Sequence, residues 1–262
     1  MTILCIETST SICSAAIMVD GVPTEECIGR EGSNHARLLP RYIEHLLQYA
    51  KEHHLTIDAV ALSEGPGSYT GLRIGAATAK GLCYGLNIPL IPVSTLQLLA
   101  AAAKSQISNL KSQISNNIVF VPMIDARRME VYTAFYDSNL NPLSDVKAVV
   151  VENEQSLIAE SQFKLTTADS QFYYFGDGAA KCREVIHAPN WHYLPDIEPL
   201  SSQCRAIIEP LSNHYREIKQ NIAYYEPFYL KDFIAAPSHI KGLKLKYQIS
   251  NIKFQLLSLS WR

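Results

Sequence analysis

Two apolar stretches of the chain each end in an acidic residue, and each is followed by a short polar turn and a second apolar stretch. The first stretch is Thr2–Ile6, which ends at Glu7 and is followed by Ile12–Val19; the second is Ile118–Ile124, which ends at Asp125. Apolar strands interleaved with helical segments are typical of α/β folds. The recurrence predicts an α/β protein with two duplicated lobes, each built on a mixed sheet flanked by helices.

The segments between these strands have clear turn and helix signals. Asp20-Gly21 is a typical hairpin turn between the strands Ile12–Val19 and Val22–Ile28. In the first half, apolar residues at helical spacing, or a glycine turn followed by a small-residue run, predict helices. The expected helices are Ser33–His53, Thr70–Leu86 and Thr95–Ala103; the remaining expected strands are Ile57–Ser63, Ile88–Val93 and Met129–Tyr136.

A short repeat separates the two halves. Lys104–Leu110 (KSQISNL) and Lys111–Asn117 (KSQISNN) are near-copies, and Lys246–Ile252 (KYQISNI) resembles them. Each copy has one or two apolar residues, too few for a packed element, so a linker is favoured over an interaction arm. We therefore predict an N-terminal lobe at 1–103, a heptad insert at 104–117, a C-terminal lobe at 118–236 and an extended, flexible tail at 237–262.

Charge and composition exclude several classes of protein. The net charge is −2, so the total charge does not favour binding to nucleic acid. The six cysteines show no CxxC or zinc spacing, and we expect them to pack as small reduced hydrophobic residues. No segment approaches the ~20 apolar residues of a membrane helix. The first apolar stretch stops at Glu7 without a basic region before it, so we expect no signal peptide. The expected location is the cytoplasm.

The segment Ile57–Leu86 resembles two nucleotide-binding motifs and matches neither. A strand, the turn Gly65–Gly71 and a helix would present backbone N–H groups to an anion. A P-loop requires a lysine after its last glycine, but Gly71 is followed by Leu72-Arg73. A dinucleotide site requires an acid after the next strand, and that strand ends in Val93-Ser94.

Small residues recur on one face of the helix that follows. Gly71, Gly75 and Ala79 stand at i, i+4 and i+8. A glycine inside a helix costs about 1 kcal/mol relative to alanine, so this face must allow another backbone to approach closely. The residues alone favour packing within the chain over an interface with a partner, and leave both open.

The sequence has no recognisable catalytic or metal-binding constellation. HExxH, a helical HxxxH pair and GxSxG are all absent, and His35 is expected to be solvated or to make a local cap contact at a helix start. Glu7 and Asp125 end equivalent strands and are the best candidates for contacts to a nucleotide or a metal. Arg127 and Arg128 could hold an anion beside Asp125, or could simply be solvated at a turn.

Six segments resemble the TsaB (YeaZ) family of bacterial tRNA threonylcarbamoyladenosine biosynthesis proteins, over about residues 1–236. They read ILCIETS from Ile3, GPGSYTGLRIG from Gly65, AKGL from Ala79, MIDARRMEVY from Met123, YFGDGAAK from Tyr174 and PFYLKDF from Pro227. The resemblance implies an actin-like ATPase fold with duplicated lobes. It also implies kinship with TsaD, the subunit that transfers a threonylcarbamoyl group to the adenosine beside the anticodon in ANN-decoding tRNAs.

The resemblance implies a partner subunit that is not itself an enzyme. TsaD-like proteins have a metal-binding HxxxH after the strand that follows the glycine-rich helix, and here that place reads Ser94–Leu99 without histidine. The family implies that such a subunit pairs with a TsaD-like catalytic subunit, is joined by a TsaE-like ATPase, forms homodimers and meets tRNA only through the complex. No cofactor is implied beyond a weakly bound adenine nucleotide.

The resemblance changes the balance between the two interpretations of the small-residue helix and favours an interface. The expected interface residues lie on the first two helices: Leu38, Tyr42, Thr70, Gly71, Arg73, Ile74, Gly75, Thr78, Ala79 and Leu82. The residual nucleotide or anion cleft is expected at Glu7, Thr8, Ser9, Asp125, Arg127, Gly176 and Gly178. The alternatives are a nucleotide-binding protein or hydrolase of the actin-like superfamily, and an RNA-binding module.

Overall fold

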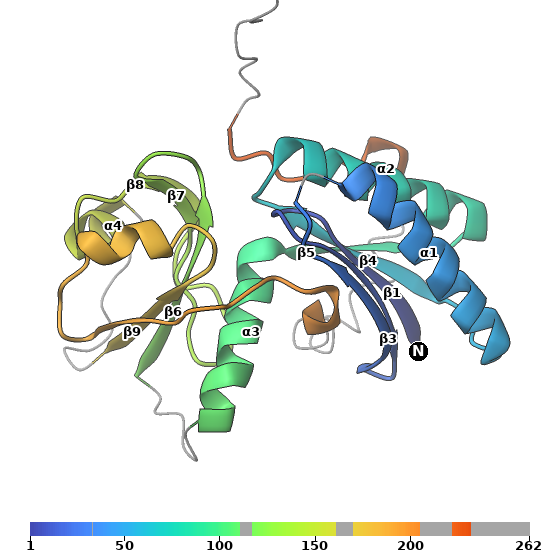
Figure 1. The fold of residues 1–262 in the computed structure, drawn as a ribbon, viewed down its shortest axis with the longest axis horizontal. Coiled ribbons are helices and arrows are strands. Elements are labelled where there is room, and N and C mark those ends of the chain that lie inside the picture. The colour runs from blue at the N-terminus through green and yellow to red at the C-terminus, as the bar shows by residue number, and fades with distance from the viewer. Residues whose placement is uncertain (33, 111–116, 161–169, 205–221, 232–262) are drawn as a thin grey trace, which may run out of the picture. The chain divides into compact units, whose positions relative to one another are not determined.

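The computed structural model describes residues 1–32, 34–110, 117–160, 170–204 and 222–231. Met1–Lys231 form one compact unit, and 232–262 form a separate one that lies outside the described residues. The first sheet has the strand order β3-β2-β1-β4-β5 (Figure 1). Its strands are β1 (Thr2–Glu7), β2 (Cys13–Val19), β3 (Val22–Gly29), β4 (Ala59–Gly65) and β5 (Leu90–Ser94).

The second sheet repeats the topology of the first. Its order is β10-β9-β6-β7-β8, so in both sheets the first strand pairs antiparallel with the second and parallel with the fourth. Its strands are β6 (Ile118–Asp125), β7 (Glu130–Thr133), β8 (Lys147–Val150), β9 (Gln171–Phe175) and β10 (Trp191–Tyr193). The predicted α/β fold with two duplicated lobes and mixed sheets is confirmed.

The turn between β2 and β3 forms as the sequence predicts. Asp20 and Gly21 both have positive φ, 47° and 75°. A two-residue hairpin turn needs this left-handed backbone because it follows the twist of the two strands. β3 is the exposed edge of the sheet, and Pro23 and two glutamates on it discourage pairing with another strand.

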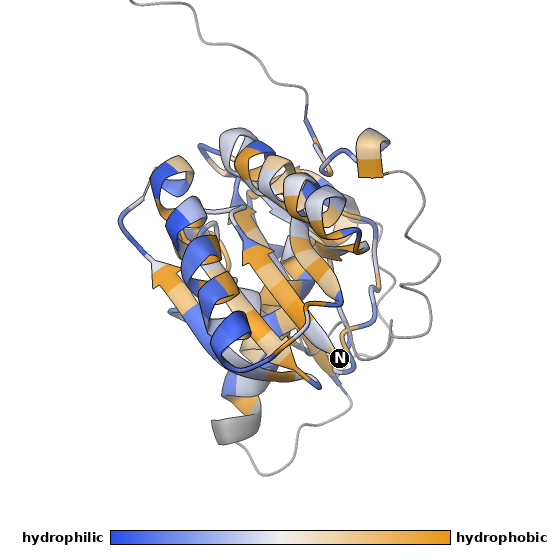
Figure 2. Ribbon diagram, turned by 90° about the vertical axis from the view of Figure 1, so that its right-hand side faces the viewer, coloured by the Kyte–Doolittle hydropathy of each residue, from blue (hydrophilic) through white to orange (hydrophobic). Residues whose placement is uncertain are grey.

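Two helices cover one face of the first sheet, and a third begins at its end. α1 (His35–Glu52) and α2 (Tyr69–Leu86) contact each other and pack against the sheet (Figure 1). Leu4, Ile6 and Leu62 from the strands meet Leu39 and Leu46 from α1 in the core between them. Figure 2 shows the strands as largely hydrophobic and the helices as mixed hydrophilic and hydrophobic.

The helix α3 (Thr95–Leu110) is longer than the sequence predicts. It continues through the first copy of the repeat, which we expected to be part of a linker, and Ile107 in that copy is only 2% exposed. Leu96, Leu99, Ala103 and Ile107 are all buried, at helical spacing. One apolar residue placed on this stripe is enough to extend the helix, which is why counting apolar residues per copy gave the wrong result. Most of the second copy lies outside the described residues.

The second half contains an aromatic core. Phe135, Phe172 and Trp191 contact one another, with Phe172 and Trp191 stacked at a ring-centroid distance of 4.6 Å. The helix α4 (Glu154–Glu160) and the 3-10 helix η1 (Ala180–Glu184) belong to this half, and η2 (Ser201–Cys204) and η3 (Ile222–Tyr224) follow. No helix in the described part of the chain combines the length and apolar character needed to cross a membrane.

Candidate functional site

The acidic residue that ends β1 is buried with the two residues after it. Glu7, Thr8 and Ser9 are all 0% exposed. One carboxylate oxygen of Glu7 accepts hydrogen bonds from the backbone N–H and from the hydroxyl of Ser9, the latter at 2.6 Å. Burial raises the pKa of the Glu7 carboxyl to about 7, and these hydrogen bonds oppose the rise only in part. The predicted cleft residues in the first half are therefore together but closed to solvent.

The turn that leads into α2 and the first turn of α2 close this loop. An added Cβ at Gly67 would overlap the carbonyl oxygen of Ser9, and one at Gly71 would overlap that of Thr8. The Thr8 hydroxyl donates a hydrogen bond of 2.9 Å to the carbonyl of Gly71. Glycine is required where two backbones approach this closely. The space that a phosphate would need beside the loop is thus filled by the chain's own helix.

This packing corrects the prediction of the interface. An added Cβ at Gly75 would overlap the Thr8 side chain, and Ala79 is 0% exposed in the core. Gly71, Gly75 and Ala79 therefore face the first sheet of their own lobe and are not available to a partner. These three small residues thus pack within the chain, and an interface at the other residues named for it stays a prediction.

The second half repeats this arrangement at the end of β6. The backbone N–H of Asp125 donates to the Asp177 carboxylate at 2.9 Å, and Lys181 forms an ion pair with Asp125. An added Cβ at Gly178 would lie 2.8 Å from the carbonyl carbon of Ile124. As in the first half, glycines after the fourth strand pack onto the end of the first strand.

Arg127 and Gly176, the other two residues of the predicted cleft in the second half, also lie at the end of β6. The backbone N–H of Arg127 donates to Asp125 at 3.1 Å, and an added Cβ at Gly176 would overlap the carbonyl oxygen of Met123. The charge of Asp177 acts on Glu7 and contributes to the rise of its pKa.

Within the described residues, no three His, Cys, Asp or Glu side chains are grouped so that they could hold a metal ion.

His35 is buried and contacts residues distant in sequence, whereas we expected it to be solvated or to make a local cap contact. It is 6% exposed, and its Nε2 lies 3.0 Å from the carbonyl oxygen of Thr10 and 3.1 Å from that of Ile12. A ring N–H at this position donates to the backbone carbonyls of the loop. The histidine thus anchors the start of α1 to the loop after Glu7, a contact that no local sequence pattern indicates.

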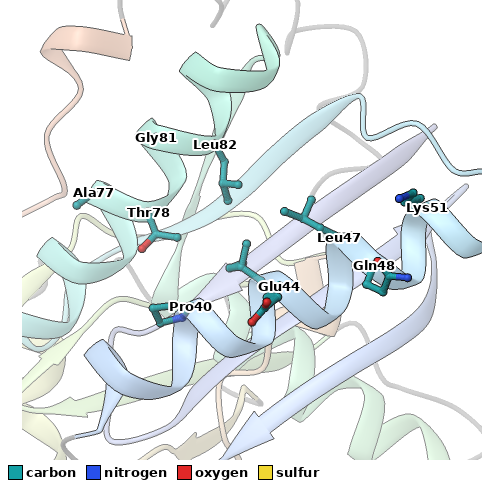
Figure 3. Close-up of a pocket in the computed structure, with 10 residues that line it drawn as sticks. Pro40, Glu44, Leu47, Gln48, Lys51, Ala77, Thr78, Gly81 and Leu82 are labelled. Atoms are coloured by element: carbon teal, nitrogen blue, oxygen red, sulfur yellow. The ribbon is translucent and has the colours of Figure 1, made fainter.

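The surface of the first lobe has a groove between α1 and α2. Its volume is about 750 Å³ (Figure 3). Leu47 of α1 and Leu82 of α2 point toward each other across it, with Glu44 and Lys51 along the α1 side. The lining residues are Pro40, Ile43, Glu44, Leu47, Gln48, Lys51, Ala77, Thr78, Gly81 and Leu82.

Only two of the predicted interface residues line this groove, Thr78 and Leu82. An added Cβ at Gly29 of β3 would lie 2.7 Å from the side chains of both Leu38 and Tyr42, which therefore pack on their own sheet. Thr70 and Arg73 are exposed, and Ile74 packs partly against the core. Sequence reasoning missed the eight other lining residues.

Two glycines of α2 have no structural reason among the residues that the structure describes. An added Cβ at Gly81 or at Gly85 would meet no atom within 4 Å, and both residues are exposed. With the exposed Ala77 they stand at i, i+4 and i+8. Each glycine costs about 1 kcal/mol relative to alanine in a helix, and nothing in the described part of the chain compensates this cost.

Comparison with known families gives a match over most of the chain. The model of the family described as "TsaD: tRNA N6-adenosine threonylcarbamoyltransferase" matches residues 30–237. The "tRNA threonylcarbamoyladenosine biosynthesis protein TsaB" of Bacillus subtilis is 30% identical over 187 residues, 71% of this chain and 75% of that protein. The proteins of the same name from Haemophilus influenzae and Escherichia coli are 36% and 37% identical, over 50% and 54% of this chain.

The chain spans about half the length of two of these relatives, 52% of the H. influenzae protein and 57% of the E. coli protein. Among solved structures, YeaZ from Pseudomonas aeruginosa superposes with a TM-score of 0.68 at 22% identity, covering 87% of this chain and 99% of that one. A second P. aeruginosa structure, described as similar to the peptidase YEAZ, gives 0.70 at 21% identity, covering 88% and 99%. At these identities the likeness concerns the fold.

Proposed function

The chain belongs to the TsaB (YeaZ) family, and from this membership we propose that it is a non-catalytic subunit in the biosynthesis of threonylcarbamoyladenosine in tRNA. In this proposal it pairs with a TsaD-like catalytic subunit in the cytoplasm and activates it. The modified nucleoside is the adenosine next to the anticodon, and the tRNA is met only through the complex.

The closed strand ends support a non-catalytic role. Catalysis by positioned groups requires side chains that substrate can reach. Glu7 is fully buried against Ser9, and α2 fills the space beside Thr8. The stretch Ser94–Leu99, where the TsaD-like histidines would lie, contains none. These features disfavour a nucleotide site in the first half and with it the alternative of a hydrolase.

The observation that carries the proposal is the groove between α1 and α2 beside the unexplained glycines. Gly81 lines the groove, Gly85 follows one turn later, and both expose helix backbone at a cost that packing within the described chain does not offset. Small residues let a partner helix approach closely, and Leu47 and Leu82 give it an apolar surface to bury. A helix of the TsaD-like subunit is the occupant we propose.

The same surface would serve a homodimer. A two-fold contact uses the same residues on both copies, so it competes with any other helix for the groove. Excess TsaD-like subunit should therefore convert homodimer into heterodimer. We propose no separate surface for the TsaE-like ATPase, which joins the assembled pair.

The test is co-elution of the purified chain with a TsaD-like subunit in size-exclusion chromatography. Gly81→Leu should abolish co-elution because its side chain fills the approach to α2, whereas its melting temperature should stay near that of the wild type because the space around Gly81 is open. Ala180→Leu adds similar bulk at an exposed position in the other lobe and should co-elute normally.

Two results would reject parts of this proposal. If Gly81→Leu still co-elutes, the groove is not the pairing surface. If the wild-type chain does not pair at all, and instead hydrolyses ATP on its own with a rate that Glu7→Gln abolishes, the hydrolase alternative replaces the subunit role.

A further inference from the structure

The turn between β6 and β7 contains two arginines in an unfavourable backbone conformation. Arg127 has a φ of 73° and Arg128 a φ of 51°, so both lie in the left-handed region. Residues other than glycine, asparagine and aspartate rarely adopt this conformation, because their Cβ then crowds the following carbonyl oxygen. Other residues would fit this backbone better, so the geometry of the turn does not explain the two arginines.

A second turn of the chain shows which residues such a backbone favours. Asp20 and Gly21, between β2 and β3, have φ values of 47° and 75°. Among the residues that the structure describes, these two turns are the only places where two successive residues have positive φ. The first has residue types that suit such a turn, whereas the second has two arginines. Backbone strain that persists in a fold is often kept for a function.

The side chains of Arg127 and Arg128 have no partner within the described part of the chain. Both residues are exposed, and neither guanidinium forms a hydrogen bond, an ion pair or a ring contact with another described residue. The backbone N–H of Arg127 donates to Asp125, but this contact does not require an arginine side chain. The two side chains are therefore free to bind a partner.

The acidic residues at this end of the second sheet are already engaged. Lys181 forms an ion pair with Asp125, and Lys231 forms one with Glu130. The carboxylate of Asp177 accepts the backbone N–H of Asp125 at 2.9 Å. Two guanidinium groups on one turn thus present positive charge that no acid of the described residues pairs with. A ligand for this turn should be an anion.

We propose, on the basis of the subunit role proposed above, that Arg127 and Arg128 hold phosphate groups of the RNA backbone once tRNA is bound to the complex. A guanidinium donates two parallel hydrogen bonds to a phosphate, which makes arginine a preferred ligand for the backbone of nucleic acids. Phosphate contacts position a nucleic acid without reading its sequence. A subunit whose strand ends are closed to substrate can still make such contacts.

The net charge of the chain agrees with a contact that forms only inside the complex. At −2, the chain as a whole gives RNA no long-range attraction. A TsaD-like subunit that holds the tRNA would raise the effective concentration of the RNA at the turn, so that two further contacts strengthen binding. The isolated chain should therefore bind tRNA far more weakly than the complex does.

The first test measures the affinity of the assembled complex for tRNA at several salt concentrations. Arg127→Gln and Arg128→Gln should each weaken binding. Each should also reduce the salt dependence, lowering the slope of log K against log salt by about 1 in magnitude, because one phosphate fewer is neutralised. Arg183→Gln is the matched control and should change neither quantity. This arginine is exposed in the same lobe, but its guanidinium lies over the Tyr193 ring, 4.9 Å from the ring centre.

The second test uses the melting temperature of the isolated chain to show that the arginines do not serve the fold. Arg127→Gly and Arg128→Gly should melt at or above the temperature of the wild type, because glycine adopts a positive φ without strain. The same two variants should weaken the binding of tRNA to the complex. A fall of several degrees in melting temperature would show that the arginines stabilise the turn, and would overturn the proposal.

Co-elution distinguishes this proposal from the subunit role on which it rests. All of these variants should still co-elute with the TsaD-like subunit. If the wild-type chain does not co-elute, both proposals fail. If it does, and the two glutamine variants bind tRNA with unchanged affinity and salt dependence, only the phosphate contact is rejected. Loss of co-elution in these variants would assign the turn to acidic groups of the protein partner, and would reject the RNA contact as well.

Discussion

At the scale of single residues, Glu64 provides a test of how burial affects stability. It lies near the end of β4, where its carbonyl accepts a hydrogen bond of 2.7 Å from the backbone N–H of Phe228. Burial alone raises the pKa of its carboxyl. The folded state therefore holds this proton to a higher pH than the unfolded chain, in which a glutamate titrates near about 4.3.

The sign of the effect follows from proton linkage. Because the folded state binds the proton more tightly, its stability falls as pH rises past about 4.3 toward the raised pKa of the folded state. Glu64→Gln cannot lose a proton, so its free energy of unfolding should decline less over this range. Urea unfolding of both proteins between pH 4 and 8 measures the difference. Parallel pH profiles would show that the carboxyl is effectively solvated.

The sequence predicts where the residues of the candidate cleft lie along the strands, but it does not predict their burial or their contacts. The position of Glu7 and Asp125 at the ends of equivalent strands follows from the apolar pattern, and the structure places both there. The burial of Glu7 depends on α2 closing over Thr8, a contact between residues more than sixty positions apart. The contact of His35 with the same loop depends on how α1 docks, which periodicity does not encode.

At the scale of single elements, α2 shows why a spacing pattern does not identify a face. Gly71, Gly75 and Ala79 repeat every four residues, and so do Ala77, Gly81 and Gly85. The first row contacts the strand ends and the second is exposed. Both rows have the same periodicity, so the sequence predicted close backbone approach correctly and could not decide which row faces the core.

The two rows should respond oppositely to alanine. Gly81→Ala and Gly85→Ala should each raise the free energy of unfolding of the isolated chain by about 1 kcal/mol, because helix propensity improves and the new Cβ meets nothing. Gly75→Ala should lower it by about 1–3 kcal/mol, because the Cβ overlaps Thr8. Urea unfolding checks all three. Destabilisation by Gly81→Ala would mean that this face is packed after all.

The end of α3 gives a second prediction at this scale. Ile107 is buried among apolar residues of the second-sheet core, so Ile107→Ala should cost about 2–5 kcal/mol of stability. Replacing 111–116 by a short polar linker should cost little, because changes of loop length have small entropic effects. Melting temperatures of the Ile107→Ala variant and of the variant with 111–116 replaced test both predictions. Equal melting temperatures for Ile107→Ala and the wild type would contradict the packing of the helix end.

At the scale of the whole molecule, the duplication was the most predictable feature. One strand–acid–turn–strand pattern, found twice, was enough to indicate two lobes, and both sheets have the same strand order. The domain limits 1–103, 104–117, 118–236 and 237–262 remain predictions. The grouping of Met1–Lys231 into one compact unit ends five residues before the expected limit at 236, and 237–262 lie outside the described residues.

The segment 222–231 should matter to the stability of the whole chain. Lys80 donates hydrogen bonds to the carbonyls of Ala223 and Tyr225, at 2.9 Å and 3.0 Å, and the ring of Tyr229 lies 5.1 Å from that of Tyr69. A chain that ends after Lys231 should melt like the full-length protein, whereas one that ends after Asn221 should melt several degrees lower. If instead the chain that ends after Lys231 already melts as low as the one that ends after Asn221, the stabilising contacts lie in 232–262.

The two glycine rows of α2 also predict how the gene should drift. Gly71 and Gly75 of the inner row are held by contacts inside the molecule, so any lineage that keeps the fold must keep them. A Cβ added at Gly81 or Gly85 would meet nothing within 4 Å in the described chain, and a single base change converts a glycine codon into an alanine codon. A lineage that lost the binding partner should therefore exchange these two for alanine first, while the inner row stays fixed.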